Sequence, residues 1–202
     1  MMKVQPRPND DTAPCVGCGL CCDGTLYVRA QVTPGEEPRM TEYGLELITH
    51  ENKPFFLQPC PHQSCGRCTI YGERFDICHS FSCALLRRYH AGAIDLAEAR
   101  KVIEGAMQLL EKVRTDYPSA GQYVERSRLR RALADELDKA DLSERGPIAR
   151  QLLKLVSTDV YLDRWFRDEK DQAGSPEETS GSNSARKTPR DRAQSKPPRK
   201  II

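Results

Sequence analysis

The chain has 202 residues and a formal net charge of +2 at pH 7, from 31 Lys and Arg against 29 Asp and Glu. Because this charge is nearly balanced, the overall field of the protein does not draw it to nucleic acid. The sequence contains no run of about 18 apolar residues, the length that predicts a membrane-spanning helix. The first residues also lack the apolar segment of a signal peptide, so we expect a cytoplasmic protein.

Residues 1–14 carry three prolines and mixed charges, and we expect them to form a flexible arm. All nine cysteines then follow in two clusters. The first is Cys15-Val-Gly-Cys18-Gly-Leu-Cys21-Cys22, and the second contains Cys60, Cys65, Cys68, Cys78 and Cys83. Thiolates two residues apart can bind one metal ion from a tight turn, whereas disulfides are rare in a reducing compartment and fit poorly with an odd number of cysteines. The pattern therefore predicts metal binding.

Three short apolar segments predict a small antiparallel sheet. The segment 26–32 is followed by a Pro34-Gly35 turn, and the segments 45–48 and 55–57 flank a turn at 51–53. Such a sheet would bring Cys60 back beside the first cysteine cluster.

The sequence becomes helical from about Asp95, which has the capping-box spacing to Glu98. An apolar stripe at helical spacing follows and ends before Pro118: Ala99, Val102, Ile103, Ala106, Leu109, Leu110 and Val113. A second helix is expected from about Gly121 to Asp138, and a third with Pro147 in its first turn. The residues Tyr161, Leu162, Trp165 and Phe166 are expected to pack onto these helices.

From residue 171 onward the composition is Ser, Gly, Pro, Glu, Arg and Lys, which predicts a disordered tail. Seven Arg or Lys residues lie between Arg186 and Lys200, opposed only by Asp191. This basic part could contact nucleic acid or another anionic partner through phosphate groups, or serve only as a solvated tail.

The spacing of the cysteines leaves the metal open. Cys21 and Cys22 are neighbours, so their side chains should point to opposite sides and serve two adjacent sites or bridge two metals. Two zinc sites, a site of two metals and an iron–sulfur cluster all accept thiolates. The Cx4CxxC spacing from Cys60 to Cys68 resembles plant-type [2Fe–2S] loops, although the fourth cysteine is usually further away. His62 and His79 lie in the second cluster and could replace a thiolate, but a hydrogen-bonding or surface role is the stronger expectation for both.

The two clusters, together with Gly66-Arg-Cys68-Thr-Ile-Tyr71 and Arg74-Phe-Asp-Ile-Cys78, resemble the YkgJ-type CxxCxxCC cysteine-cluster family, which is described as chelating zinc or iron. The resemblance covers residues 15–83. It implies eight ligands, with Cys65 as an addition: Cys15, Cys18, Cys21, Cys22, Cys60, Cys68, Cys78 and Cys83. The chain departs from the family at Phe75, where proline is usual, and at His79, where arginine is common. A flagellin lysine methylase is similar in its cysteine cluster, and that similarity implies an iron–sulfur centre as the alternative.

Together these observations predict an α+β protein in which a metal-clustered, loop and β-hairpin N-terminal half packs on a C-terminal helical half. We expect a flexible arm (1–14), a metal-binding domain (15–92), a helical region (93–170) and a basic tail (171–202). The expected function is zinc or iron binding in a structural or regulatory role. The alternative is an iron–sulfur or iron-dependent redox enzyme, or a methylase-like accessory protein. Whether the protein is an enzyme stays open, and a protein partner would bind the helical region. Among the ligands, we expect Tyr71 to pack beside the site, and Arg67 and Arg74 to offset thiolate charge.

Overall fold

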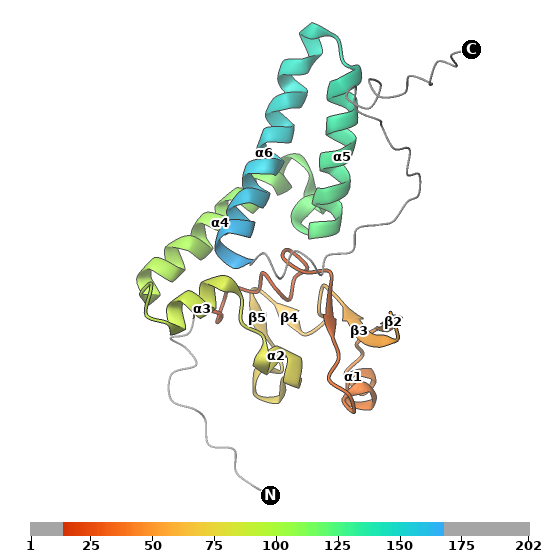
Figure 1. Cartoon of the computed structure of the whole chain (residues 1–202), viewed down its shortest axis with the longest axis vertical. Coiled ribbons are helices and arrows are strands. Elements are labelled where there is room, and N and C mark those ends of the chain that lie inside the picture. Colours follow the sequence, from red (N-terminus) through yellow and green to blue (C-terminus); the bar gives the residue numbers. More distant parts are fainter. Residues whose placement is uncertain (1–13, 168–202) are drawn as a thin grey trace, which may run out of the picture.

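The computed structural model describes residues 14–167, so the predicted arm and the predicted basic tail lie outside the described residues. The fold is mixed, with the strands in the N-terminal part and three long helices in the C-terminal part (Figure 1). In chain order the elements are β1 (Arg29–Gln31), α1 (Glu37–Glu42), β2 (Leu47–His50), β3 (Lys53–Leu57), β4 (Gln63–Ser64), β5 (Arg67–Cys68), α2 (Asp76–Ser80), α3 (Ala84–His90), α4 (Leu96–Asp116), α5 (Tyr123–Lys139) and α6 (Leu142–Phe166).

The three predicted strands form an antiparallel sheet in the order β1-β3-β2, in which Ala30 and Leu47 both lie opposite Phe56. The sheet is confirmed, but β1 begins at Arg29 and not at Leu26. The reason is that the Leu26 N–H donates to the Leu20 carbonyl (3.0 Å), which ties Leu26 to the first cysteine cluster and not to a neighbouring strand.

Several short elements have no counterpart in the sequence prediction. The periodicity predicts no helix before Asp95, whereas α1, α2 and α3 have six, five and seven residues. The hairpin of β4 and β5 has two residues in each strand. Elements this short do not repeat an apolar pattern, so periodicity cannot reveal them.

The long helices follow their sequence signals closely. The Glu98 N–H donates to Asp95 Oδ1 (2.7 Å) and the Asp95 N–H to Glu98 Oε2 (2.9 Å), which confirms the capping box of α4. Five residues of the predicted stripe are buried: Ala99, Val102, Ala106, Leu110 and Val113. The aromatic group also packs as expected, with Leu162 and Phe166 buried and Tyr161 and Trp165 partly buried in one cluster with α4 residues.

The prediction for Pro147 is wrong, because α6 begins five residues earlier, at Leu142. A proline inside a helix removes the N–H that would bond to the carbonyl four residues before it, here that of Ser143. Residues 141–147 are exposed, so water can reach this carbonyl, and the proline is tolerated.

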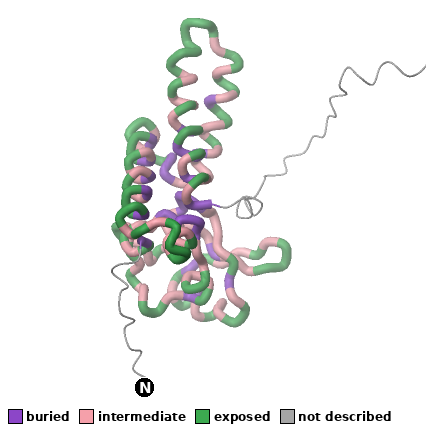
Figure 2. Tube along the Cα trace, turned by 60° about the vertical axis from the view of Figure 1, so that its left-hand side comes forward, coloured by how far each residue is buried: buried purple, intermediate pink, exposed green. Residues whose placement is uncertain are grey.

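Buried residues concentrate where the helices meet the N-terminal part and along the helix contacts, while the far end of the α5–α6 hairpin is largely exposed (Figure 2). One apolar cluster joins Leu20, Leu26 and Leu85 to residues of α4 and α6. A second joins Phe56 of β3, Met40 of α1 and Phe75, and a third joins α4, α5 and α6. None of the helices in residues 14–167 combines the length and the apolar character needed to cross a bilayer.

Candidate metal centre

Backbone hydrogen bonds place the second cysteine cluster beside the first. The Cys60 N–H donates to the Cys22 carbonyl (2.8 Å), as expected from a sheet that returns the chain to its start. Within the first cluster, the Cys18 N–H bonds to the Cys15 carbonyl (3.1 Å) and the Cys22 N–H to the Gly19 carbonyl (2.9 Å). These two tight turns set the four cysteines of the first cluster around a compact loop.

Two glycines let the β4–β5 hairpin pack directly on this loop. A Cβ atom on Gly66 would lie 2.6 Å from the Gly17 carbonyl oxygen, and one on Gly19 would lie 2.8 Å from the Gly66 Cα. Both Gly66 (φ +76°) and Gly19 (φ +68°) also have left-handed backbone conformations, which favour glycine. The close approach brings Cys68 of β5 to the first cluster.

Three cysteines of the first cluster group with the last cysteine of the second. Cys83 is the N-cap of α3, and its Sγ accepts a hydrogen bond from the Leu86 N–H (3.4 Å). Cys18 and Cys21 pack against the same apolar cluster that contains Cys83. Cys15 is exposed, and its partial desolvation and then the nearby charge of Cys83 raise its pKa to about 11. Burial raises the pKa of Cys18 to about 12 and that of Cys21 well above its ordinary value. The charge of Cys83 raises both pKa values further.

The remaining cysteine of the first cluster groups with three cysteines of the second. Burial, followed by the charges of Cys60, Cys78 and Cys68, raises the pKa of Cys22 to about 12. Burial also raises the pKa of Cys78 to about 11, with Cys60 and Cys68 as the next causes. Cys60 and Cys78 pack against the second apolar cluster, around Phe75.

By the thiol charges that act on their pKa values, the eight cysteines that the family resemblance implies as ligands divide into two sets of four. We call the first the Cys83 group (Cys15, Cys18, Cys21 and Cys83) and the second the Cys60 group (Cys22, Cys60, Cys68 and Cys78). The neighbours Cys21 and Cys22 fall in different groups, and whether they serve two adjacent sites or one of them bridges two metals stays a prediction. The two groups adjoin, because the charge of Cys22 also contributes to the raised pKa of Cys21.

The ninth cysteine and the two histidines have other surroundings. Cys65 is exposed at the tip of the β4–β5 hairpin with φ +49°, and the Ser64 hydroxyl is 4.0 Å from its sulfur. The His62 Nε2 atom lies 2.7 Å from the Tyr43 carbonyl oxygen, and the two rings meet edge to face. This contact agrees with the expected hydrogen-bonding role of His62. His79 is exposed at the end of α2, as expected for a surface residue.

Arginine side chains supply positive charge beside both groups. The charge of Arg74 lowers the pKa of Cys15 in one group and of Cys78 in the other, against the larger effect of burial. Its guanidinium lies over the Tyr71 ring, 3.6 Å from the ring centre, and its Nε donates to the Tyr71 carbonyl (3.0 Å). Arg74 thus lies where its charge reaches thiols of both groups, and Tyr71 contacts Arg74, while Arg67 is exposed in β5. The expected packing of Tyr71 beside the site stays a prediction.

A second arginine beside the thiols was not predicted. Arg87 lies on α3, one helical turn after Cys83, and its charge lowers the pKa of that thiol, although burial raises it overall. The four-residue spacing is visible in the sequence, but it has meaning only once residues 84–90 are known to be helical.

The donor atoms match a thiolate metal site in chemistry but are not closed around an ion. All nine cysteines are free thiols. Within residues 14–167, no three His, Cys, Asp or Glu side chains are placed so that they could hold one metal ion. Rotation about χ1 moves a cysteine sulfur between staggered positions, so side-chain rotation is the movement that a closed site would need.

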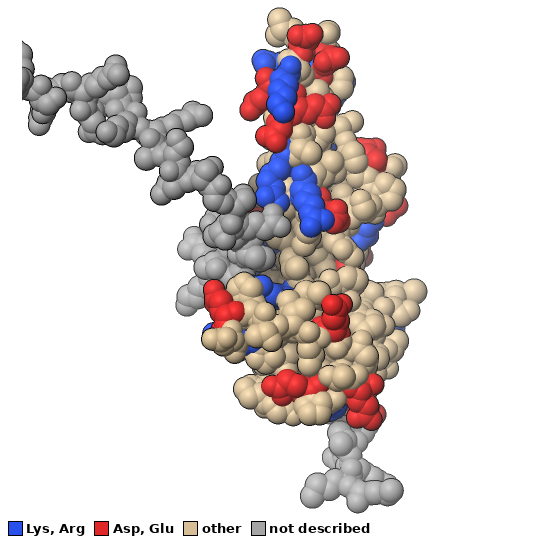
Figure 3. All heavy atoms as spheres, turned by 90° about the vertical axis from the view of Figure 1, so that its right-hand side faces the viewer, with Lys and Arg blue, Asp and Glu red and all other residues tan. Residues whose placement is uncertain are grey.

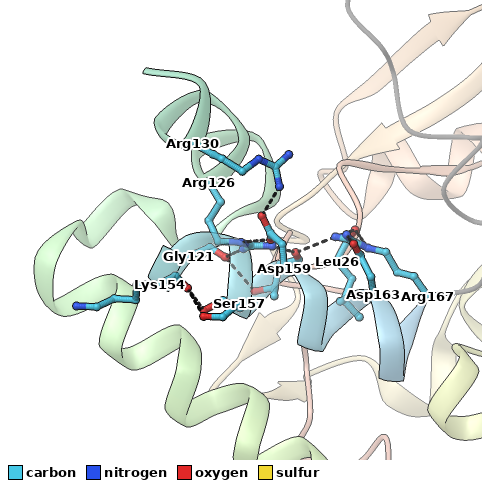
Figure 4. Close-up of polar contacts among 11 residues, drawn as sticks. Leu26, Gly121, Arg126, Arg130, Lys154, Ser157, Asp159, Asp163 and Arg167 are labelled. Carbon is cyan, nitrogen blue, oxygen red and sulfur yellow. Dashed lines mark hydrogen bonds and ion pairs between the residues drawn. The ribbon is translucent and has the colours of Figure 1, made fainter. Parts of the chain in front are cut away.

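A buried polar network ties the end of the first cluster to the helical region (Figure 4). Arg126 of α5 is completely buried; it donates through Nη2 to the Thr25 carbonyl (2.8 Å) and through Nε to Asp159 of α6 (2.9 Å). Arg130 donates to the other oxygen of Asp159 (2.8 Å). The backbone three residues after Cys22 is therefore bonded directly to α5.

Arg167 makes a second connection of the same kind. Its Nε and Nη2 donate to the Leu26 carbonyl (3.1 and 2.6 Å), and its Nη1 to Asp163 (2.6 Å). In addition, the Tyr123 N–H at the start of α5 donates to the Gly24 carbonyl (2.9 Å). Residues 24–26 are thus fixed to both α5 and α6, so the position of the cysteine loop depends on the helices.

Comparisons with protein-family models, with curated proteins and with solved structures found no match to this chain. The relation to the YkgJ-type family therefore rests on the cysteine pattern and stays a prediction.

Proposed function

We propose that this protein binds zinc or iron through two four-thiolate sites, one formed by the Cys83 group and one by the Cys60 group. The observation that supports the proposal is that the charges of these eight thiols raise one another's pKa values mainly within two sets of four. Four thiolates are a complete donor set for a tetrahedral structural site. The YkgJ-type resemblance implies the same eight residues.

The role that we propose for the metal is structural. Each ion would cross-link segments that are far apart in sequence: the first cysteine loop to the start of α3 in one site, and the same loop to the β4–β5 hairpin and α2 in the other. A four-thiolate site with a divalent ion carries a formal charge of about −2. Arg74, whose charge acts on a thiol of each group, would offset this charge at both sites.

Metal binding would release protons, since thiolates and not thiols are the ligands. The raised pKa values of Cys15, Cys18, Cys22 and Cys78, about 11 to 12, mean that these thiols are protonated at pH 7. Protons therefore compete with the metal throughout the neutral range. We expect tighter binding at pH 8 than at pH 6, with protons released on metal addition in a weakly buffered solution.

The test is elemental analysis of the full chain purified without air, with its absorption spectrum. We expect two metal ions per chain, or an iron–sulfur content with brown colour and absorption near about 400 nm if the alternative chemistry holds. Cys15→Ser and Cys78→Ser should each remove one site and leave the other, because they belong to different groups.

Cys65→Ser is the matched control and should keep the full metal content. A protein that contains no transition metal would refute the proposal. Equal losses from Cys65→Ser and Cys15→Ser would refute the assignment of the ligands.

A further inference from the structure

Helix α6 exposes an apolar stripe on the side opposite its buried face. The four large hydrophobic side chains that residues 14–167 expose all belong to this helix: Leu142 (89% exposed), Leu153 (65%), Val156 (36%) and Val160 (60%). The buried face is formed by other residues, namely Leu155, Thr158, Asp159, Leu162 and Phe166. The exposed stripe is therefore not needed for packing within one chain.

The stripe has the spacing of a helix–helix seam. With Gly146 and Ala149 included, its positions are separated alternately by four and three residues: Leu142, Gly146, Ala149, Leu153, Val156 and Val160. Apolar residues at this spacing form the contact between paired helices in coiled coils. We call these six residues the α6 stripe.

The segments outside the described residues do not offer a matching surface. Residues 168–202 follow α6 directly, but their only large apolar side chains are Ile201 and Ile202 at the very end. Residues 1–13 contain Met1, Met2 and Val4 within four positions, too short a run to cover a stripe of 19 residues. Neither segment can supply six apolar layers.

The stripe is complementary to itself when two copies run antiparallel. Around a two-fold axis near residue 151, Leu142 faces the partner's Val160, Gly146 faces the partner's Val156, and Ala149 faces the partner's Leu153. In the inner layers a small residue thus lies opposite a large one, an alternation that suits close packing of two helices. A parallel pairing would instead place Gly146 on Gly146 and leave a gap.

The charges at the two ends of the hairpin favour the same arrangement. Acidic side chains gather around its far end (Figure 3), where five acidic residues outnumber Lys139 and Arg145: Asp135, Glu136, Asp138, Asp141 and Glu144. At the other end of the stripe, Arg88 and Arg164 both lie near the Trp165 ring, and Arg88 donates to the Arg164 carbonyl (3.0 Å). Antiparallel pairing places the acidic end of one copy beside the basic end of the other, whereas parallel pairing would bring the two acidic ends together.

We propose that the protein forms a homodimer in which the α6 stripes of two chains pack antiparallel. The contact is isologous, since each layer occurs twice about the two-fold axis. The dimer is independent of the metal sites, which lie in the other part of the chain.

The test is the mass of the full chain in solution, measured by light scattering and analytical ultracentrifugation over a range of concentrations. We expect the parent protein to be a dimer. Leu153→Glu would bury an unpaired charge twice per dimer, so the dissociation constant should rise by at least about 100-fold. Val160→Glu, nearer the end of the stripe, should raise it by about tenfold.

Gln108→Glu adds the same charge at an exposed position of α4 and should leave the dimer unchanged. Because residues 153 and 160 are both well exposed within the chain, neither variant should lower the melting temperature of the monomer, and circular dichroism checks this. A parent protein that is monomeric at every concentration, or a Leu153→Glu variant that dimerises as well as the parent, would overturn the proposal.

Discussion

The cysteine-bearing part of the chain, residues 14–92, and the helical part, residues 93–167, are held together in different ways. The three long helices have 21, 17 and 25 residues, and they bury apolar faces against one another. The strands of the cysteine-bearing part have two to five residues, and the apolar cluster around Phe56 and Phe75 contains only five buried side chains. Helices of this length can be stable through packing, whereas short strands and loops need another source of stability. The thiol groups are the candidate source.

The two parts are not independent, because they share an apolar cluster and a polar connection. Leu20 and Leu26 pack with residues of α4 and α6, and Arg126 and Arg167 bond to the backbone of residues 25 and 26. The connection ends only three residues from Cys22. Each prediction below changes one part or the connection between them.

The largest effect is expected from removing the proposed metal. Binding of a structural metal contributes about 10 kcal/mol or more to the folding free energy of a small metal-binding domain. Chelation of both ions should therefore unfold most of residues 14–92 while α4, α5 and α6 keep their helical structure. The variant Cys18→Ser, which removes only the ion of the Cys83 group, should lower protection around that group and leave the Cys60 group bound. Amide hydrogen exchange measures the two parts separately. Cys65→Ser is the control, and equal loss of protection in both parts would show that the helices also depend on the metal.

The next largest loss of stability is expected from breaking the polar connection between the two parts. Arg126→Met leaves Asp159 buried with only one of its two arginine partners, and it leaves the Thr25 carbonyl with only the longer hydrogen bond from Arg167 Nη2 (3.5 Å). Breaking a buried ion pair by removing one partner costs about 3–5 kcal/mol. Chemical denaturation should show this loss for both parts together.

Arg128→Met is the matched control for this prediction. Arg128 lies on the same helix and pairs with Glu125 at 3.0 Å, but 60% of its side chain is exposed. Exposed pairs contribute at most about 1 kcal/mol. Similar losses for the two variants would mean that the buried network does not hold the two parts together.

The sequence predicts the helical part better than the cysteine-bearing part, and the reason is the range of the signals. The stripe of α4 and the Asp95 cap are local patterns, so both could be read directly. The grouping of Cys83 with Cys15, by contrast, depends on contacts between segments more than 60 residues apart. The sequence identified eight candidate ligands through the family resemblance, but not their division into two groups.

Local sequence patterns do not predict the polar connection between the two parts either. In the sequence, Arg126, Arg130 and Asp159 resemble the charged residues of any solvated helix surface. Their burial follows from the packing of α5 against α6 and against residues 24–26, which no periodicity reveals. Pro147 shows the opposite error: its preference for a first helical turn is a real local signal, but the exposed chain around it allows the helix to begin earlier.

A glycine variant tests the contact between the two cysteine clusters without touching a thiol. Gly66→Ala should lower the free energy of unfolding by about 2–4 kcal/mol, because it combines a left-handed backbone with a Cβ atom 2.6 Å from the Gly17 carbonyl oxygen. Gly44 has nearly the same backbone angle (φ +73°) but no atom within 4 Å of an added Cβ. Gly44→Ala should therefore cost only the backbone term, about 1–2 kcal/mol.

The two variants should also differ in metal content. Only Gly66→Ala separates the β4–β5 hairpin from the first cysteine loop, so only this variant should weaken binding by the Cys60 group. If Gly44→Ala lowers metal content as much as Gly66→Ala does, backbone strain and not the close approach would explain the effect.

The smallest effect is expected within the helical part alone. Asp95→Ala removes the side-chain acceptor for the Glu98 N–H and should cost about 1 kcal/mol. Asp141 occupies the corresponding position before α6 but makes no capping hydrogen bond with its side chain, so Asp141→Ala should cost less. Thermal unfolding of the two variants measures the difference, and metal content should stay at the parent level in both. A loss of metal from Asp95→Ala would mean that the start of α4, which follows α3 and Cys83, contributes to the Cys83 group. The boundary between the part stabilised by helix packing and the part stabilised by ligands would then lie within α4 and not at residue 93.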